Sequence, residues 1–411
     1  MIPFFSALLG LWLLAAPLTF GYESESDWIC GALLILVGLG IRTPRFVAAW
    51  GFALIGLWLE LAPLLLRTPS VAHYLNDTIV GLLAIALFLI LPAWSNQLPD
   101  IGPSIPPGWT YNPSSLPQRL PIAFLAFIGW MLSRYMASYQ LGYIDAIWDP
   151  FFPDGTFHVI TSDISKSFPV PDAGLGALAY SLEMLSTFKG GACRWRTMPW
   201  MVLVFGVLAI PLSLTSVILI LLQPLVVGAW CTWCLITAFC MLILMALSID
   251  EVVACLQYLK HSKEKPFLWL LFQGGKCPGA KRDARTPKLG APLQELLKAS
   301  CWGLTFPWNL VLTALFGGGL MLIPSYFALR GLIADLDHAL GALIVVVSVI
   351  SFSEIARPLR WLNVPLTAGI VFAALFHTSG PSFVLELILC LAIAFTSVIR
   401  GEIREQSRWR A

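Results

Sequence analysis

Long apolar runs recur along the whole chain, and their lengths constrain the fold more than any other feature. We count twelve in the 411 residues; most reach the roughly 17–25 residues that cross a hydrocarbon core, while the second and sixth are near the lower limit. Because 58% of the residues are hydrophobic and only 12% charged, an ordinary soluble domain is excluded. The sequence therefore predicts an all-α, polytopic membrane helix bundle with about 12 transmembrane helices. The expected spans lie near residues 3–21, 28–42, 45–66, 75–94, 119–140, 172–188, 199–222, 225–248, 307–329, 336–356, 360–377 and 381–400.

Basic and acidic residues alternate from one expected loop to the next. If the N-terminus is cytoplasmic, only Arg67, Arg134, Lys166 and Arg330 of the 25 Lys and Arg residues fall in the outer half. Basic residues gather in cytoplasmic loops, so this alternation sets the orientation. We expect a multi-pass protein of the plasma membrane (the bacterial inner membrane), with both termini cytoplasmic and Cys231 near the outer face.

A short pattern repeats near both ends of the chain. Gly10–Leu13 recurs as Gly56–Leu59, and the next apolar run carries an acid four residues before a glycine or, in one weak copy, a cysteine. The acids at this place are Asp27, Asp77, Asp337 and Glu386. Blocks of this kind resemble the SPW-type membrane repeat and indicate pairs of helical hairpins, with no activity implied.

The repeated acids allow two interpretations. Carboxylates inside a membrane are costly and often belong to a proton or ion path. Alternatively, Asp27, Asp77 and Asp337 lie at the outer ends of helices, where they cap the N-termini and interact with the helix dipole. We favour capping. The five histidines and the scattered acids form no metal-binding pattern in the sequence, and nothing indicates nucleic-acid binding.

Two cysteines, Cys231 and Cys234, lie within a segment that is otherwise apolar from residue 225 to 247. Positions i and i+3 of a helix share a face, so the two sulfurs could bridge. In the first turns of a helix, the positive end of the dipole would make the Cys231 thiol more reactive. Zinc binding is disfavoured because a second ligand pair is missing nearby. The pair indicates redox chemistry with a lipid-soluble partner, or else two small packing residues.

The stretch Trp230–Ala238 resembles the redox helix of the vitamin K epoxide reductase family, including a hydroxyl residue, Thr237, three positions after the second cysteine. Pro171–Tyr180 is similar to the start of that family's short second helix. An Asn is common there, hydrogen-bonded to the quinone, whereas this chain has Asp172. The order of spans and loops over residues 119–259 also matches the family's layout.

The resemblance implies a membrane thiol:quinone oxidoreductase. Its catalytic residues would be Cys231, which exchanges with an incoming dithiol, and Cys234, which lies beside the quinone. The implied quinone-binding residues are Asp172, Tyr180, Trp230, Trp233 and Thr237. The quinone, ubiquinone or menaquinone, is a substrate, and an external thioredoxin-like dithiol protein is a possible partner. The two tryptophans are equally well explained as anchors at the membrane interface.

One departure from the family leaves a second function open. Active members usually carry two more cysteines in the outer loop, but residues 141–171 contain none here. Either a separate protein supplies the dithiol, or the chain is a non-catalytic membrane transport or scaffold module with structural cysteines. The expected domains are an SPW-like repeat module (1–94), a Pro/Gly/Ser linker (95–118), a four-helix redox domain (119–259), a basic cytoplasmic loop (260–305) and a second repeat module with a tail (306–411).

Overall fold

The structure is a computed structural model that describes residues 1–411 except 41–43, 69, 95–98, 263–264, 378–379 and 409–411. The described residues form helices and loops without a named strand, which confirms the all-α prediction. Nine of the described helices are long and apolar enough to cross a membrane. Helices α2 (Glu25–Leu39) and α8 (Asp172–Ser186) have only 15 residues each. The count of about twelve spans therefore stays a prediction.

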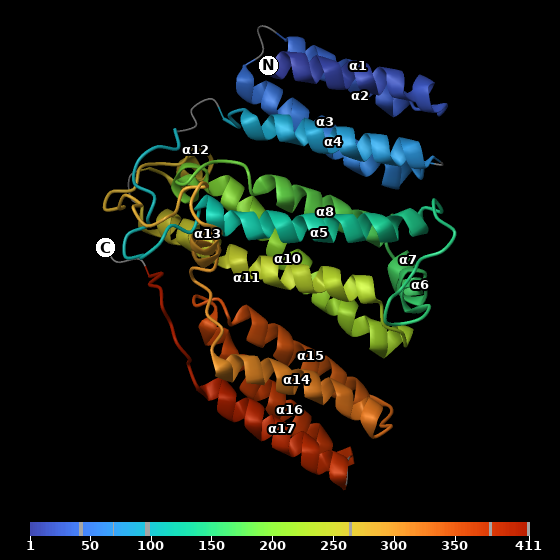
Figure 1. Ribbon diagram of the computed structural model, residues 1–411, viewed down its shortest axis with the longest axis vertical. Helices are drawn as coiled ribbons and strands as arrows, with labels where there is room; N and C mark the ends of the chain where they lie inside the picture. The colour runs from blue at the N-terminus through green and yellow to red at the C-terminus, as the bar shows by residue number, and fades with distance from the viewer. Residues whose placement is uncertain (41–43, 69, 95–98, 263–264, 378–379, 409–411) are drawn as a thin grey trace.

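The helices stack in three groups along the longest axis of the molecule (Figure 1). The N-terminal group holds α1 (Ile2–Phe20), α2, α3 (Arg45–Leu66) and α4 (Val71–Ile90). The central group holds α5 (Leu116–Gln140), α8, α10 (Pro199–Leu222) and α11 (Thr232–His261), with the short helices α6 (Gly155–Ile160) and α7 (Asp163–Lys166) at one end. The C-terminal group holds α14 (Trp308–Tyr326), α15 (Leu332–Ile350), α16 (Asn363–His377), which follows the 3-10 helix Arg357–Leu362, and α17 (Pro381–Val398).

The repeated glycines are points of close contact between paired helices. A Cβ atom at Gly10 would lie 2.5 Å from the carbonyl oxygen of Gly31, and one at Gly56 would lie 2.7 Å from that of Gly81. The C-terminal group repeats this contact with Gly317 and Gly341, at 3.0 Å. Small residues let helix backbones approach closely in membranes, where no hydrophobic force drives helices together. The sequence repeat is thus a repeat of helix-packing contacts.

The redox helix starts later than the sequence predicts. The expected span began near residue 225, but residues 223–227 continue α10 as a π-helical turn, and α11 begins at Thr232. Gly228 between them has a φ of 70°, a left-handed conformation that glycine adopts without steric cost. Pro224 lacks a backbone N–H and cannot support a regular turn of helix before it. The chain therefore reverses here, and Cys231 becomes the N-cap residue of α11.

The two polar connections pack together at one end of the stacked helices. We expected residues 95–118 to be a linker without a core of its own, yet Trp109 and Tyr111 are buried in one cluster with Trp195 and Tyr258. Beside this cluster, Arg194 and Glu251 form a buried ion pair of 2.5 Å. The loop after α11 packs at the same end, because the backbone of Lys281 pairs with that of Ile105 in an isolated antiparallel β-bridge. These connections share a core with the central helices, while the domain boundaries themselves stay predictions.

The capping interpretation of the repeated acids is wrong for Asp77 and Asp337. Both lie inside their helices, more than a turn after the first residues of α4 and α15, and both are buried. Asp27 does lie in the first turn of α2, but the cap is Ser24, whose hydroxyl accepts the backbone N–H of Asp27 at 3.2 Å. The acids four residues before the glycines therefore face the interior of each helix group.

Candidate functional site

Cys231 and Cys234 form a disulfide at the start of α11. Their Cα atoms are 5.3 Å apart, within the usual range for a bridge. The Cys231 sulfur also accepts the backbone N–H of Cys234 at 3.1 Å, as an N-cap side chain does. Cys234 lies in the first turn of the helix, where the positive end of the dipole favours a thiolate. A helical start at Thr232 therefore places both sulfurs in this field.

Cys231 is fully buried, which corrects the expectation that it is reachable from outside. The hydroxyl of Thr156 in α6 lies 3.4 Å from the Cys231 sulfur. The backbone N–H of Cys231 donates to the side-chain oxygen of Gln223 at 3.0 Å. Gly155, the first residue of α6, packs against the carbonyl oxygen of Trp230, which a Cβ atom would approach to 2.0 Å. The outer loop thus closes over this sulfur, and access to it requires α6 to move.

Asp149 holds the outer loop on the start of α11. Its carboxylate accepts the backbone N–H and the hydroxyl of Thr232, the hydroxyl of Thr156 at 2.5 Å, and the backbone N–H of Phe152 at 2.9 Å. Burial opposes ionisation of Asp149, but the hydrogen bonds from Thr156, Thr232 and the backbone outweigh it and hold the pKa well below its usual range. The anchor is therefore ionised at neutral pH.

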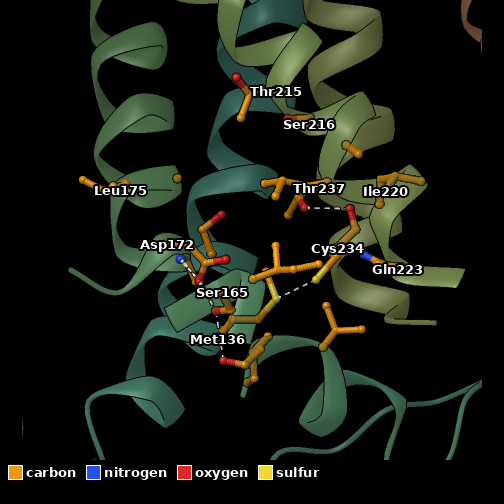
Figure 2. Close-up of a pocket in the computed structure, with 18 of the residues that line it drawn as sticks. Met136, Ser165, Asp172, Leu175, Thr215, Ser216, Ile220, Gln223, Cys234 and Thr237 are labelled. Atoms are coloured by element: carbon orange, nitrogen blue, oxygen red, sulfur yellow. Dashed lines mark hydrogen bonds between the residues drawn. The ribbon is translucent and has the colours of Figure 1, made fainter. Parts of the chain in front are cut away.

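Cys234 faces a cavity of about 230 Å³ between α5, α8, α10 and α11 (Figure 2). Four of the predicted site residues line it, namely Asp172, Tyr180, Cys234 and Thr237. Much of the remaining wall is apolar, with Ile160, Leu212, Leu219 and Met241 among its residues. The sulfur of Met136 lies 3.6 Å from that of Cys234. The cavity is therefore mostly apolar, with one sulfur of the disulfide in its wall.

Hydrogen bonds to neighbouring residues hold three polar side chains of the cavity in place, those of Asp172, Tyr180 and Thr237. The Tyr180 hydroxyl donates to the carbonyl oxygen of Thr237 at 2.6 Å, and the Thr237 hydroxyl donates to that of Cys234 at 3.0 Å. Asp172 accepts from the side-chain amide of Gln140 at 2.6 Å and from the hydroxyl of Ser165 at 2.8 Å through the same oxygen, Oδ1. Asp172 thus joins the start of α8 to the outer loop at the edge of the cavity.

The two tryptophans of the motif do not line this cavity. The indole N–H of Trp233 donates to the carbonyl oxygen of Trp148 in the outer loop at 2.6 Å. Trp230 lies against Phe152 and His338, with ring centroids 6.5 and 6.3 Å away. Their positions at the outer end of the bundle suit interface anchors, which was the second explanation offered for them.

Several residues of the site were missed by the sequence analysis. Gln223 binds the Cys231 backbone and lines the cavity, and Asp149, Thr156 and Gln140 hold the outer loop in place. Gln223 was detectable as a polar residue beside a proline in an apolar run. The others carry no such signal, because their partners are distant in the sequence.

A disulfide thus lies at the start of a helix long and apolar enough to cross a membrane, beside an apolar cavity. Residues 120–249 match the model of the vitamin K epoxide reductase family, and residues 2–91 match that of the SPW repeat domain. Both resemblances inferred from the sequence are confirmed for these segments. Comparisons with curated proteins and with solved structures give no significant match.

Proposed function

We propose that the protein is a thiol:quinone oxidoreductase that passes electrons from external thiols through Cys231 and Cys234 to a membrane quinone. The observation that carries the proposal is the position of the bridge. Cys231 lies beneath the outer loop, whereas Cys234 lines an apolar cavity among membrane helices. One disulfide thus adjoins both an aqueous loop and a lipid-like chamber.

The exchange with a thiol partner balances within the pair. A thiolate of the external dithiol attacks the Cys231 sulfur, the bridge breaks, and Cys234 leaves as a thiolate. The partner's second thiol attacks the mixed disulfide and releases Cys231. The partner leaves as a disulfide, and the pair then holds two electrons and two protons. A quinone substrate takes up both electrons and both protons, becomes a quinol, and the bridge forms again.

The residues around Cys234 suit a quinone as substrate. Apolar side chains from several helices can enclose its ring and tail, while the helix start stabilises the Cys234 thiolate. Asp172 and Thr237 are among the polar side chains of the chamber. The cavity chemistry fits ubiquinone and menaquinone alike.

The electron donor in this proposal is a separate dithiol protein. Because residues 141–171 contain no cysteine, no thiol of that loop can relay electrons to Cys231. A thioredoxin-like domain at the outer face of the plasma membrane would have the required exposed dithiol. It must displace α6, since Thr156 and Gly155 cover the target sulfur.

The test is the redox state of the pair in membranes whose quinone pool is fully oxidised or fully reduced. A maleimide of high mass reports free thiols, in a variant with Cys277 and Cys301, the two free cysteines that are not buried, replaced by serine. A Cys231→Ala, Cys234→Ala double variant identifies the signal.

We expect the Cys231–Cys234 bridge when the quinone pool is oxidised, and two free thiols when the pool is reduced and a dithiol is present. If both cysteines stay reduced when the pool is fully oxidised, the proposal fails. A bridge that persists with dithiol and without quinone would instead identify a structural disulfide, as in the scaffold alternative.

A further inference from the structure

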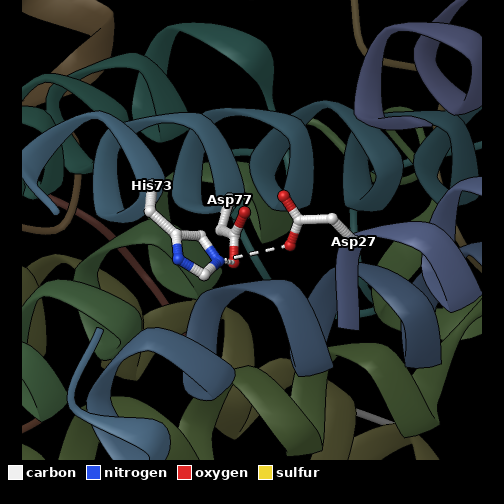
Figure 3. Close-up of side chains that lie close together, drawn as sticks. All are labelled: Asp27, His73 and Asp77. Carbon is white, nitrogen blue, oxygen red and sulfur yellow. Dashed lines mark hydrogen bonds and ion pairs between the residues drawn. The ribbon is translucent and has the colours of Figure 1, made fainter. Parts of the chain in front are cut away.

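The N-terminal helices enclose a cluster of three buried side chains that the redox site does not use. Asp27 of α2 and His73 and Asp77 of α4 each offer one ligand atom, and these atoms all lie within 4.8 Å of one another (Figure 3). The sequence analysis expected no metal-binding pattern. His73 and Asp77 are four residues apart, but Asp27 precedes His73 by 46 residues, so only the tertiary packing of the N-terminal helix group brings the three side chains together.

The spacing suits ligands around an ion better than a hydrogen-bonded triad. His73 Nε2 lies 3.3 Å from Asp27 Oδ1 and 3.3 Å from Asp77 Oδ2. One Nε2–H can donate to only one carboxylate, and charge-assisted hydrogen bonds are shorter, about 2.7–2.9 Å. Around an ion with bonds of about 2.0–2.2 Å, tetrahedral ligand atoms stand roughly 3.4 Å apart. Both distances from His73 Nε2 therefore match those that a small cation imposes, and all three atoms lie within 4.8 Å of one another.

Asp77 supplies an independent observation. Its exposed fraction is 0%, and within the described part of the chain neither carboxylate oxygen accepts a hydrogen bond of good geometry, although Oδ2 lies 3.3 Å from His73 Nε2. Such a group is expensive to bury unless it is paired or binds a metal. Figure 3 shows the carboxylates of Asp77 and Asp27 gathered at the Nε2 edge of the His73 ring.

The side chains around the cluster hold two of the ligands in place. Asp27 accepts from the hydroxyl of Ser24 at 2.6 Å and from that of Tyr22 at 2.7 Å. The Tyr22 ring stacks on the His73 ring, with centroids 4.2 Å apart. Hydrogen bonds and packing of this kind orient metal ligands and are usual around protein metal sites.

We propose that Asp27, His73 and Asp77 bind a divalent first-row transition metal ion, with Zn²⁺ as the probe. One imidazole and two carboxylates form a mixed nitrogen and oxygen donor set that suits such an ion. The two carboxylates also provide the negative charge that a dication needs in a medium of low dielectric. This site does not depend on the proposed redox function.

The repeat provides a matched control within the same chain. Asp337 and Glu386 are buried at the equivalent positions of the C-terminal helices, but no histidine stands four residues before either of them. If two buried carboxylates were enough for metal binding, the C-terminal pair would bind the ion as well. The proposal requires that Asp337 and Glu386 bind no ion.

The test is metal content of the full-length protein in detergent, purified without a histidine tag and with its free thiols alkylated. After incubation with Zn²⁺ and desalting, we expect about one zinc per wild-type chain by mass spectrometry. His73→Gln and Asp77→Asn should retain less than about a tenth of this, since each removes a ligand. Asp337→Asn should retain all of it. Zn²⁺ should also raise the unfolding midpoint of the wild type, reversibly with a chelator.

X-ray absorption on the zinc-loaded wild type tests the proposal without any variant, in case a variant fails to fold. Nitrogen and oxygen ligands alone are expected. A sulfur ligand, less than about a tenth of a zinc per wild-type chain, or equal zinc in folded His73→Gln would each overturn the proposal. In the latter two cases the cluster is only an ion pair of His73 with two carboxylates. Because the readout is metal content, failure of the redox proposal would leave these results unchanged.

Discussion

The two sulfurs of the Cys231–Cys234 bridge have different neighbours, and this difference predicts which of them a protein thiol attacks. Cys231 lies under α6 at the outer end of the bundle, and Cys234 faces the membrane cavity. A protein partner can approach only from the side of the loop. The distinction belongs to single residues, because the two positions are less than one helical turn apart.

Replacing each cysteine in turn should therefore give unequal trapping. Cys234→Ala leaves Cys231 without a resolving thiol, so a mixed disulfide with an external dithiol protein should accumulate. Cys231→Ala should trap at most about a tenth as much, because a partner cannot reach the cavity. Non-reducing gels of membranes treated with acid report both. Cys240→Ala, which removes a buried thiol of the same helix, is the control. Equal trapping by both variants would contradict the assignment.

Asp172 permits a second test at the scale of a residue. In Asp172→Asn the side-chain oxygen can still accept hydrogen bonds from Gln140 and Ser165, so the start of α8 should keep its position. We expect quinone turnover per folded molecule to be preserved or raised, since Asn is the usual residue in the family that this segment resembles. Asp163→Asn, in the exposed outer loop, is the control. Turnover falling by about tenfold or more in folded protein would contradict this expectation.

At the scale of elements, α6 acts as the cover of Cys231, and its fit depends on one glycine. Gly155→Ala would force a Cβ atom against the Trp230 carbonyl, which costs about 1–3 kcal/mol unless the helix shifts. We expect α6 to shift and the reduced Cys231 thiol to react several-fold faster with a membrane-impermeant maleimide.

The matched control for this variant is Gly318→Ala. A Cβ atom at Gly318 in α14 meets nothing within 4 Å, so that substitution should leave the reaction rate of Cys231 unchanged. An unchanged rate in folded Gly155→Ala would mean that α6 does not limit access to the sulfur.

The attachment of the outer loop to α11 should depend on pH through Asp149. The pKa of Asp149 is lower in the folded protein than in the unfolded chain, where it is about 3.9. The ionised carboxylate therefore stabilises the folded protein fully above the unfolded pKa, and this stabilisation is lost as the pH falls through the folded pKa. Asp149→Asn should unfold at a lower temperature than the wild type at pH 5–7. The difference should shrink progressively below about pH 4, because Asp149 then takes up a proton in the unfolded chain, which lowers the free energy of the unfolded state.

Thermal unfolding followed by fluorescence across this pH range measures the effect. Asp145→Asn, an exposed acid of the same loop, should show no such difference. A wild-type advantage that persists undiminished far below pH 4 would show that the ionised carboxylate is not responsible.

At the scale of the whole molecule, the loops collect at two ends of the stacked helices. The outer loop with α6 and α7 lies at one end, and the packed connections with the C-terminal tail lie at the other (Figure 1). This arrangement agrees with the orientation expected from the basic residues, although a membrane is needed to test it.

Single cysteines at Lys166 and Lys281 provide that test, because both side chains are exposed and lie in the two opposite layers. We expect an impermeant maleimide to label Lys166→Cys from outside intact cells and Lys281→Cys only after the membrane is opened. Labelling of both from the same side would reject the predicted topology. It would also place the dithiol partner on the wrong side.

Local sequence was enough to predict most helices, because membrane spans and caps depend on neighbouring residues. Most of the twelve apolar runs correspond to helices whose ends differ by a few residues, whereas the helix carrying the bridge, expected at 225–248, both starts and ends later, at Thr232–His261. The Cys231–Cys234 pair, the glycine repeats and both family resemblances were also readable, since each is a pattern within a short stretch. The fold of the backbone was therefore largely determined by the sequence alone.

Tertiary packing decided everything that needs residues from separate helices. The burial of Cys231 under Gly155, the tryptophans outside the cavity, and the core that Trp109 and Tyr111 share with the central helices all depend on contacts between segments distant in the sequence. The cluster of Asp27, His73 and Asp77 likewise exists only because the packing of the N-terminal helices brings side chains of α2 and α4 together. Sequence periodicity says which face of a helix is buried, but not which distant side chain it meets, because that choice follows from how the helices fit together in space.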